Sequence, residues 1–152
     1  IWMYHESNDE RDTLFEKVSV SGNASYQDEI ALTLEVDNRF RWYSRKTPTY
    51  DYGSTGYVFS DNAWHLLGIK MSTGRTATAR TGFYSHNGEP WVSSYVSRSD
   101  TALVSAGAVR IGTGYAGPLE DGKIVSVTCY NKMISDDELA DFYNATRTRF
   151  GL

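Results

Sequence analysis

The sequence predicts an all-β protein: two antiparallel β-sheets packed face to face as a sandwich, with one short helix near the C-terminal end. Three observations lead to this prediction. At least seven segments alternate apolar and polar residues with the period of two that marks a half-buried strand. Helical periodicity occurs only over 135–149, and thirteen glycines against three prolines suit a chain with many tight turns. A length of 152 residues allows one such domain and is too short for two.

Strands are predicted through most of the chain. The four even-numbered positions of 30–36 are aliphatic, which predicts one buried face. Over 39–45, Phe40 and Trp42 oppose Arg41 and Tyr43 in the same way. The Asn87–Gly88 pair favours a type I′ turn between two strands of a hairpin. The predicted strands are 1–4, 13–19, 30–36, 39–45, 64–71, 83–86, 91–97, 109–112 and 122–131.

The last predicted strand, 122–131, carries the only cysteine of the chain. Val125, Val127 and Cys129 alternate with Ser126 and Thr128, so the first three are expected on a buried face. A single cysteine permits no intrachain disulfide, and Cys129 is expected to be a small buried apolar residue.

The helix predicted over 135–149 has clear signals at its start. Ser135 followed by Glu138 forms a capping box, in which each side chain accepts a backbone N–H of the other residue. Ile134 and Leu139 occupy the two positions of a hydrophobic staple. Gly151 follows the last helical position, where helices commonly stop. We expect this helix to pack at the edge of the sandwich.

The same stretch carries a resemblance to a known family. The pattern Gly-x-Ile-x-x-Val-x-x-Tyr-Asn-x-x-Ile-Ser-x-x-Glu-Leu, from Gly122 to Leu139, resembles the closing strand and helix of laminin-G-like modules in the concanavalin A-like lectin/glucanase superfamily. Trp64–His65 and Val109-x-Ile111-Gly112 resemble two further strands of these modules. The resemblance implies a single jelly-roll domain over 1–152 that lacks its first strand and forms the C-terminal part of a longer chain.

Members of this superfamily commonly bind glycans, so aromatic residues in loops are candidate contacts. Sugars stack on flat rings, and the residues 46–56 form the longest predicted irregular stretch, rich in Tyr and Asp. Sandwich interiors are close-packed, so we expect any binding on the loops, to a glycan or to a protein partner. The candidate contacts are Tyr50, Tyr52, Tyr57, Trp91, Tyr95 and Tyr115.

Calcium is the one cofactor that the resemblance makes possible, since many laminin-G-like modules hold it at the rim through carboxylates and carbonyls. Carboxylate oxygens are the ligands that Ca²⁺ prefers. The carboxylates in predicted loops are Asp51, Asp61, Asp100 and Asp121, with Glu120 beside the last.

Catalysis is not expected. Glucanases of the superfamily align three carboxylates on one strand, but here Glu35 and Asp37 are followed by Arg39 where the third would stand. His5 and His86 are isolated in the sequence, and His65 is expected to be structural. The sequence therefore predicts a protein that is not an enzyme.

Composition and the C-terminal residues suggest where such a module works. A net charge of −4 argues against a nucleic-acid partner, and no apolar run is long enough to insert into a membrane. The residues 143–152 resemble the C-termini of lectin-like modules in structural proteins of tailed bacteriophages, and the missing disulfide suits assembly in a reducing compartment. We therefore expect a virion-surface module (capsid decoration, fibre or tail) that contacts other virion proteins or copies of itself, with weak multivalent binding to a cell-surface glycan. The alternative is an extracellular glycan-binding lectin.

Overall fold

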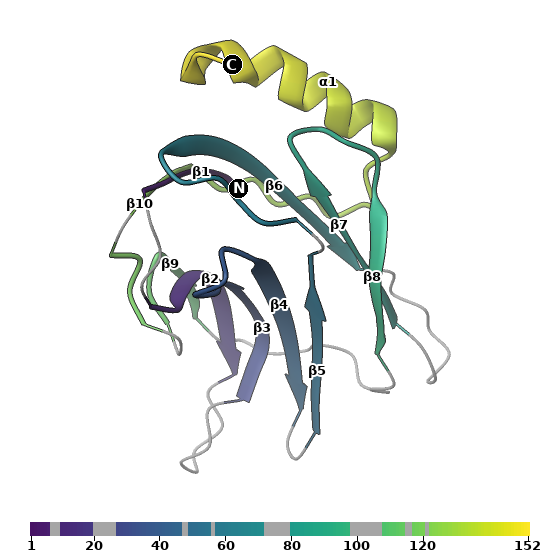
Figure 1. The fold of residues 1–152 in the computed structure, drawn as a ribbon. Coiled ribbons are helices and arrows are strands. Elements are labelled where there is room, and N and C mark those ends of the chain that lie inside the picture. The colour runs from purple at the N-terminus through teal and green to yellow at the C-terminus, as the bar shows by residue number, and fades with distance from the viewer. Residues whose placement is uncertain are drawn as a thin grey trace.

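A computed structural model describes residues 1–6, 10–19, 27–46, 49–55, 57–71, 80–97, 108–114, 117–120 and 122–152. These residues form two antiparallel sheets and a C-terminal helix, which confirms the predicted β-sandwich (Figure 1). One sheet has the order β10-β1-β6-β7-β8 and the other the order β5-β4-β3-β2-β9. The elements are β1 (Trp2–His5), β2 (Asp12–Ser19), β3 (Gln27–Leu34), β4 (Phe40–Lys46), β5 (Thr49–Ser54), β6 (Ala63–Met71), β7 (Arg80–His86), β8 (Val92–Ser97), β9 (Val109–Ile111), β10 (Gly122–Ser126), α1 (Asp136–Thr146) and a 3-10 turn (Arg147–Phe150).

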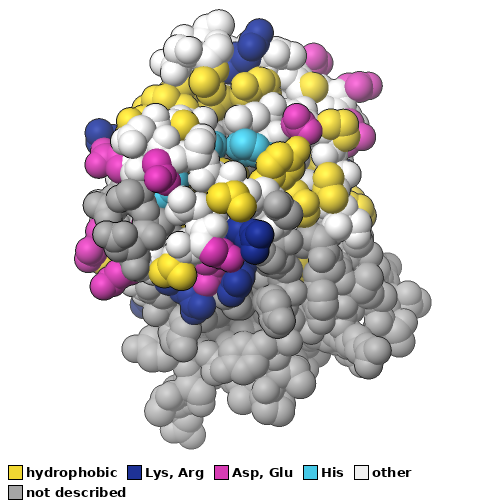
Figure 2. Space-filling model, viewed as in Figure 1, with side chains coloured by type: hydrophobic (Ala, Val, Ile, Leu, Met, Phe, Trp, Pro, Cys, Tyr) yellow, Lys and Arg dark blue, Asp and Glu magenta, His cyan; other side chains and the backbone are white. Residues whose placement is uncertain are grey.

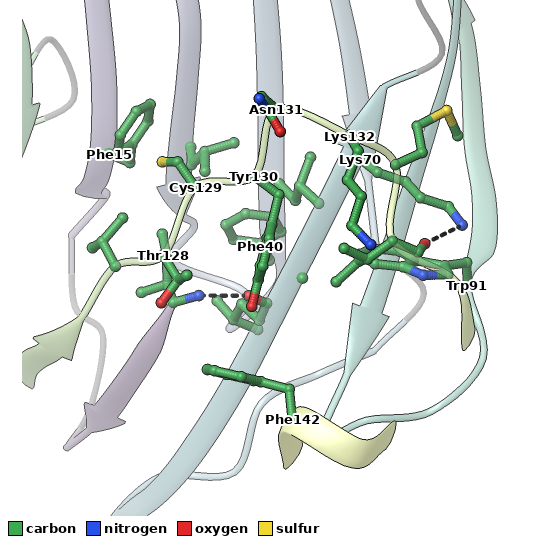
Figure 3. A pocket seen from close by; sticks show the side chains of 18 of the residues that line it. Phe15, Phe40, Lys70, Trp91, Thr128, Cys129, Tyr130, Asn131, Lys132 and Phe142 are labelled. Atoms are coloured by element: carbon green, nitrogen blue, oxygen red, sulfur yellow. Dashed lines mark hydrogen bonds between the residues drawn. The ribbon is translucent and has the colours of Figure 1, made fainter. Parts of the chain in front are cut away.

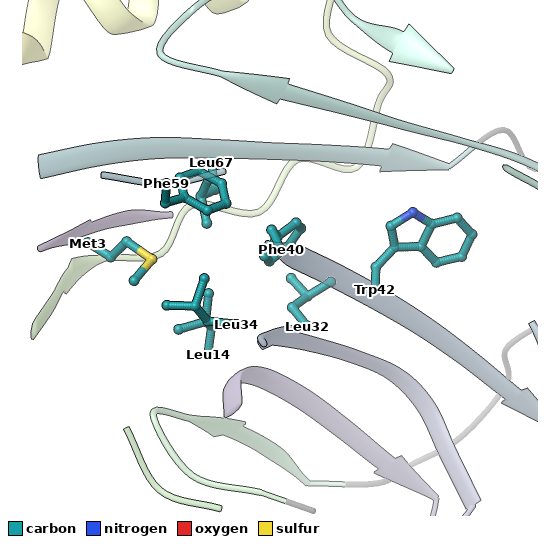
Figure 4. Packing of buried hydrophobic residues seen from close by; sticks show 8 residues of the cluster. All are labelled: Met3, Leu14, Leu32, Leu34, Phe40, Trp42, Phe59 and Leu67. Carbon is teal, nitrogen blue, oxygen red and sulfur yellow. The ribbon is translucent and has the colours of Figure 1, made fainter. Parts of the chain in front are cut away.

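The main core lies between the two sheets (Figure 4). Leu32 and Leu34 of β3 and Phe40 and Trp42 of β4 are buried there, as their alternation predicts. Val36 does not join them and is 62% exposed, because β3 ends at Leu34 and the following residues form a turn. The buried members of this core are Met3, Leu14, Leu32, Leu34, Phe40, Trp42, Phe59 and Leu67.

Close contact between the sheets depends on a glycine opposite a tryptophan. A Cβ atom added to Gly82 of β7 would lie 2.1 Å from Cζ2 of Trp42, which belongs to the other sheet. The Trp42 side chain is 1% exposed and its ring occupies the place of the missing side chain. Gly82 is therefore required by packing.

We predict that Gly82→Ala destabilises the protein by about 1–3 kcal/mol, because the added methyl overpacks the core. Urea unfolding measures the change in free energy. The cost should be smaller in a Trp42→Phe background, where the smaller ring leaves room. Equal costs in both backgrounds would show that the contact with Trp42 is not the cause.

The C-terminal helix begins as predicted. The Glu138 N–H donates to Ser135 Oγ at 3.1 Å and the Ser135 N–H donates to Glu138 Oε2 at 2.9 Å, so the capping box is complete. The α-helix ends at Thr146 and continues as the 3-10 turn, after which Gly151 adopts a left-handed φ of 74°.

The position of α1 differs from our expectation, since it lies on the outer face of the sheet β10-β1-β6-β7-β8 and not at an edge (Figure 1). Three tryptophans on that face provide an apolar surface, and the apolar face of α1 packs against it. Leu139 is 3% exposed in this second cluster. Its other members are Trp2, Leu66, Trp64, Trp91, Ile134, Phe142, Tyr143 and Phe150.

We predict that Leu139→Ala costs about 2–5 kcal/mol of unfolding free energy, because it leaves a cavity under the helix. Ser135→Ala should cost about 1 kcal/mol through the lost cap. The exposed Asp141→Ala serves as a control with little effect. Thermal and urea unfolding measure all three, and equal small losses would mean that the helix is not docked.

Three predictions about strands are wrong. The stretch 46–56 is not irregular, because Thr49–Ser54 forms β5 and pairs with β4. Cys129 is exposed instead of buried, and β10 ends at Ser126. Within β10 the inward residue is Ile124, whereas Val125 is 51% exposed, because Ile124 pairs with the core residue Met3.

Candidate functional site

Three loops at one end of the sandwich are joined by hydrogen bonds, and we call them the rim. They are the turn 35–39 between β3 and β4, the segment 57–62 before β6, and the turn 86–90 between β7 and β8. The Phe59 N–H donates to the Asn38 carbonyl at 2.8 Å. Asn38 Nδ2 donates to Asp61 Oδ1 at 2.9 Å, and the Tyr57 hydroxyl donates to Glu89 Oε2 at 3.0 Å. These bonds hold the rim in one arrangement.

A buried carboxylate anchors the first of these loops. Glu35 is 3% exposed and accepts hydrogen bonds from Thr33 Oγ1 at 2.7 Å and from Arg11 Nε at 2.8 Å. Arg41 Nη1 lies 3.4 Å from the same Oε2. Both oxygens are thus engaged by partners that neutralise the buried charge. Glu35 lies at the start of the turn 35–39, after the end of β3, and not within a strand as the aligned carboxylates of a glucanase would.

The rim exposes apolar side chains at its surface. Val36 is 62% exposed, Val58 57% and Tyr57 37%. The loops that carry the two valines are bonded to each other by the Phe59–Asn38 hydrogen bond. Figure 2 shows hydrophobic side chains between acidic and basic ones on this face, with histidine visible among them. The exposed charged groups include Asp37, Arg39, Asp61 and Glu89.

Tyr57 has one side packed and its hydroxyl engaged. Its ring centroid lies 5.1 Å from that of His86 and 6.5 Å from that of Tyr84. The hydrogen bond to Glu89, together with its negative charge, raises the pKa of Tyr57 above its usual value. Tyr57 is therefore a predicted aromatic contact that lies in a rim loop, with its ring packed against His86 and Tyr84.

Beneath Tyr57 lies a pair of histidines that are 21 positions apart in the sequence. His65 Nδ1 lies 2.9 Å from His86 Nε2, and His65 Nε2 lies 3.0 Å from the Ser60 carbonyl. A carbonyl only accepts, so His65 Nε2 carries a hydrogen and its Nδ1 accepts from His86. Burial lowers the pKa of both rings, and the neighbouring His65 further lowers that of His86, to about 4. Both are therefore neutral at pH 7.

We predict that this pair makes the protein less stable in mild acid. In the unfolded chain both histidines take up protons near pH 6.5, whereas in the folded protein they are protonated only at a lower pH. Protonation therefore favours the unfolded chain. The contribution of the pair to the free energy of unfolding is therefore fully present above pH 7. It is lost as the pH falls from 6.5 to about 4, by about 1–2 kcal/mol for His86 after allowance for its partial exposure.

The measurement is urea unfolding at pH 7, 6, 5 and 4 for the wild type and His86→Gln, whose amide can still donate to His65. Carboxylates titrate in both proteins, so the difference between their pH profiles isolates the histidine. Parallel profiles would contradict the prediction.

The structure does not gather the other predicted contacts at the rim. Trp91 lies against the helix: its backbone N–H donates to Asp136 Oδ1 at 3.0 Å, and Lys70 Nζ lies 4.5 Å from its ring centroid. Tyr50 and Tyr52 are in β5, and Tyr95 is in β8. Tyr115 lies outside the described residues.

The candidate calcium ligands do not come together among the residues that the structure describes. Asp61 Oδ1 is 3.2 Å from His5 Nε2, and Asn38 Nδ2 donates to the same oxygen. Asp51 is in β5, while Asp100 and Asp121 lie outside the described residues. In the described part of the chain, no group of three or more His, Cys, Asp or Glu side chains could hold a metal ion.

No protein-family model matches the chain, and no curated protein matches its sequence. Among the described residues, no helix is long and apolar enough to span a membrane.

Proposed function

We propose that this protein is a non-catalytic module that makes protein–protein contacts through the rim, in an assembly with many copies of the chain. The observation that carries the proposal is the exposure of Val36, Val58 and Tyr57 on loops held rigid by hydrogen bonds. A rigid surface loses little conformational entropy on binding, so its apolar contacts contribute more to affinity.

The exposed side chains favour a protein partner over a sugar. Aromatic rings bind either partner, but branched aliphatic residues such as Val36 and Val58 offer no flat face for a sugar ring. The charged residues around them form a polar border, as is usual at protein interfaces. Tyr57 alone would suit a glycan, so the alternative is a lectin-like module that stacks a sugar on this ring.

The surroundings of Glu35 support a non-catalytic function. A carboxylate held by two arginines and a threonine hydroxyl has no free oxygen to attack a sugar or to accept a proton from water. We therefore expect no release of reducing ends from laminarin or related β-glucans.

The resemblance to laminin-G-like modules of phage structural proteins suggests the setting, a virion surface such as a capsid decoration, fibre or tail. Weak contacts suffice there, because many copies act together. The same reasoning would apply to a glycan on a host cell.

The test is self-association measured by sedimentation equilibrium up to millimolar concentration. We expect wild-type chains to associate, and the double variant Val36→Ser/Val58→Ser to weaken association by at least about tenfold. Val109→Ser is the matched control, because Val109 is 55% exposed on β9 outside the rim. Both variants should keep the wild-type melting temperature.

A glycan array with wild type and Tyr57→Ala completes the experiment. Chains that stay monomeric, or an equal effect of Val109→Ser, would overturn the proposal. Glycan binding that Tyr57→Ala abolishes, without self-association, would establish the lectin alternative.

A further inference from the structure

A cavity of about 560 Å³ opens between the two sheets, where a close-packed interior was expected (Figure 3). Phe15, Leu32 and Phe40 of one sheet line it, together with Leu67 and Ile69 of β6 in the other sheet. Pockets of roughly 300–1,000 Å³ with mostly apolar walls are the usual binding sites of small molecules. We call this cavity the slot.

The slot reaches from the core between the sheets to the underside of α1. Successive residues of a strand face opposite sides of its sheet, and Leu67 and Ile69 pack in the main core. Gly68 faces the helix instead, because a Cβ atom added to it would lie 2.8 Å from the Trp91 ring and 3.6 Å from Leu139. Lys70 has the same orientation as Gly68. The slot therefore has an apolar inner end and an outer end beside Trp91 and Lys70.

Lys70 brings a half-buried ammonium group to the outer end. Its Nζ donates to the Ile134 carbonyl at 3.4 Å and lies 4.5 Å from the Trp91 ring centroid and 5.3 Å from that of Phe83. None of the ion pairs among the described residues includes Lys70. An ammonium group has three N–H donors, and a charge removed from water is usually paired with an opposite one. Lys70 therefore has donors left for an anion.

The other charges of the slot also favour an anion. Of the described residues that line it, the charged ones are Lys17, Lys70 and Lys132, and no aspartate or glutamate is among them. Lys132 pairs with Glu138, and Lys17 lies on β2 beside the edge strand β9. A positively charged lining without carboxylates complements a negatively charged group.

We propose that the slot binds a single-chain amphiphile of the fatty-acid class, with its alkyl chain between the sheets and its carboxylate at Lys70. The chain would lie against Phe15, Leu32 and Phe40, where removal of methylene groups from water is favourable. The carboxylate would accept a hydrogen bond from Lys70 and balance its charge. The slot lies apart from the rim, so this proposal does not depend on the function proposed for the rim.

The shape of the inner end favours a chain over a compact ring. Phe15 belongs to β2 and Phe40 to β4, with β3 between them, so the apolar lining extends over two strand spacings, or about 10 Å. Figure 3 shows Phe15 and Trp91 at opposite sides of the pocket. An elongated apolar space with one cation at its outer end matches a molecule with a long apolar chain and one charged end.

The test measures dissociation constants by titration calorimetry for decanoate, dodecanoate and dodecylammonium, each below its critical micelle concentration. Dodecanoate should bind at least about fourfold more tightly than decanoate, because one fully buried methylene already accounts for about fourfold. Dodecylammonium should bind at least about tenfold more weakly than dodecanoate, because its charge repels Lys70 instead of accepting its hydrogen bond.

Variants of two lysines test the position of the carboxylate. Lys70→Met keeps an apolar stem and should weaken dodecanoate binding by at least about tenfold, whereas Lys70→Arg keeps the charge and should retain most of the affinity. The matched control is Lys123→Met, because Lys123 is a 68% exposed lysine of β10 that does not line the slot. It should bind dodecanoate like the wild type. Melting temperatures confirm that each variant is folded.

Cys129 tests the position of the chain, because it is exposed, lines the slot and lies on the side of Phe15 (Figure 3). Bound dodecanoate should slow its labelling by a maleimide by at least about tenfold. Cys129→Trp places a large ring in the slot and should abolish binding.

Three results would overturn the proposal: no saturable binding below the critical micelle concentration, equal affinities for dodecanoate and dodecylammonium, or equal effects of Lys70→Met and Lys123→Met. Unchanged binding by Cys129→Trp would also overturn it, since the amphiphile would then bind elsewhere. So would a concentration-dependent dimer that protects Cys129 without any amphiphile, which would identify a second copy of the chain as the occupant.

Discussion

The structure depends on β1, because its two faces contribute to both apolar clusters. Met3 points into the core between the sheets, and Trp2 points to the opposite face, under the C-terminal helix. The Trp2 ring lies 4.4 Å from the Phe150 ring and its Nε1–H donates to Thr146 Oγ1 at 3.0 Å. A strand of four residues therefore holds two sheets and a helix together.

Local patterns predicted the parts of the fold that local interactions determine. The capping box of Ser135 and the turn at Asn87–Gly88 need only neighbouring residues, and both form: Asn87 and Gly88 have φ angles of 51° and 77°. Strands with strict alternation, such as β4, have the predicted buried faces because one side of the sheet meets water.

The errors arise where a distant segment decides the outcome. Val125 is exposed because the pairing of β10 with β1 sets the neighbouring Ile124 opposite the core residue Met3, and no local pattern contains that register. β5 was missed because Asp51 and Gly53 are poor strand formers, yet pairing with β4 satisfies the backbone there. The candidate site was predicted least well, since among the described side chains only Tyr57 of the predicted contacts lies in a rim loop. The histidine pair under it joins residues 21 positions apart.

At the rim, polar groups beneath the surface loops have partners. The buried Glu35 and His65 and the half-buried His86 have side-chain or backbone partners at hydrogen-bond distance, so the loops above them are held in place. Loops that are already ordered lose little conformational entropy on binding, and the side chains that they expose can then contribute more to affinity. This is the physical reason for our proposal of a folded protein surface as the partner of the rim.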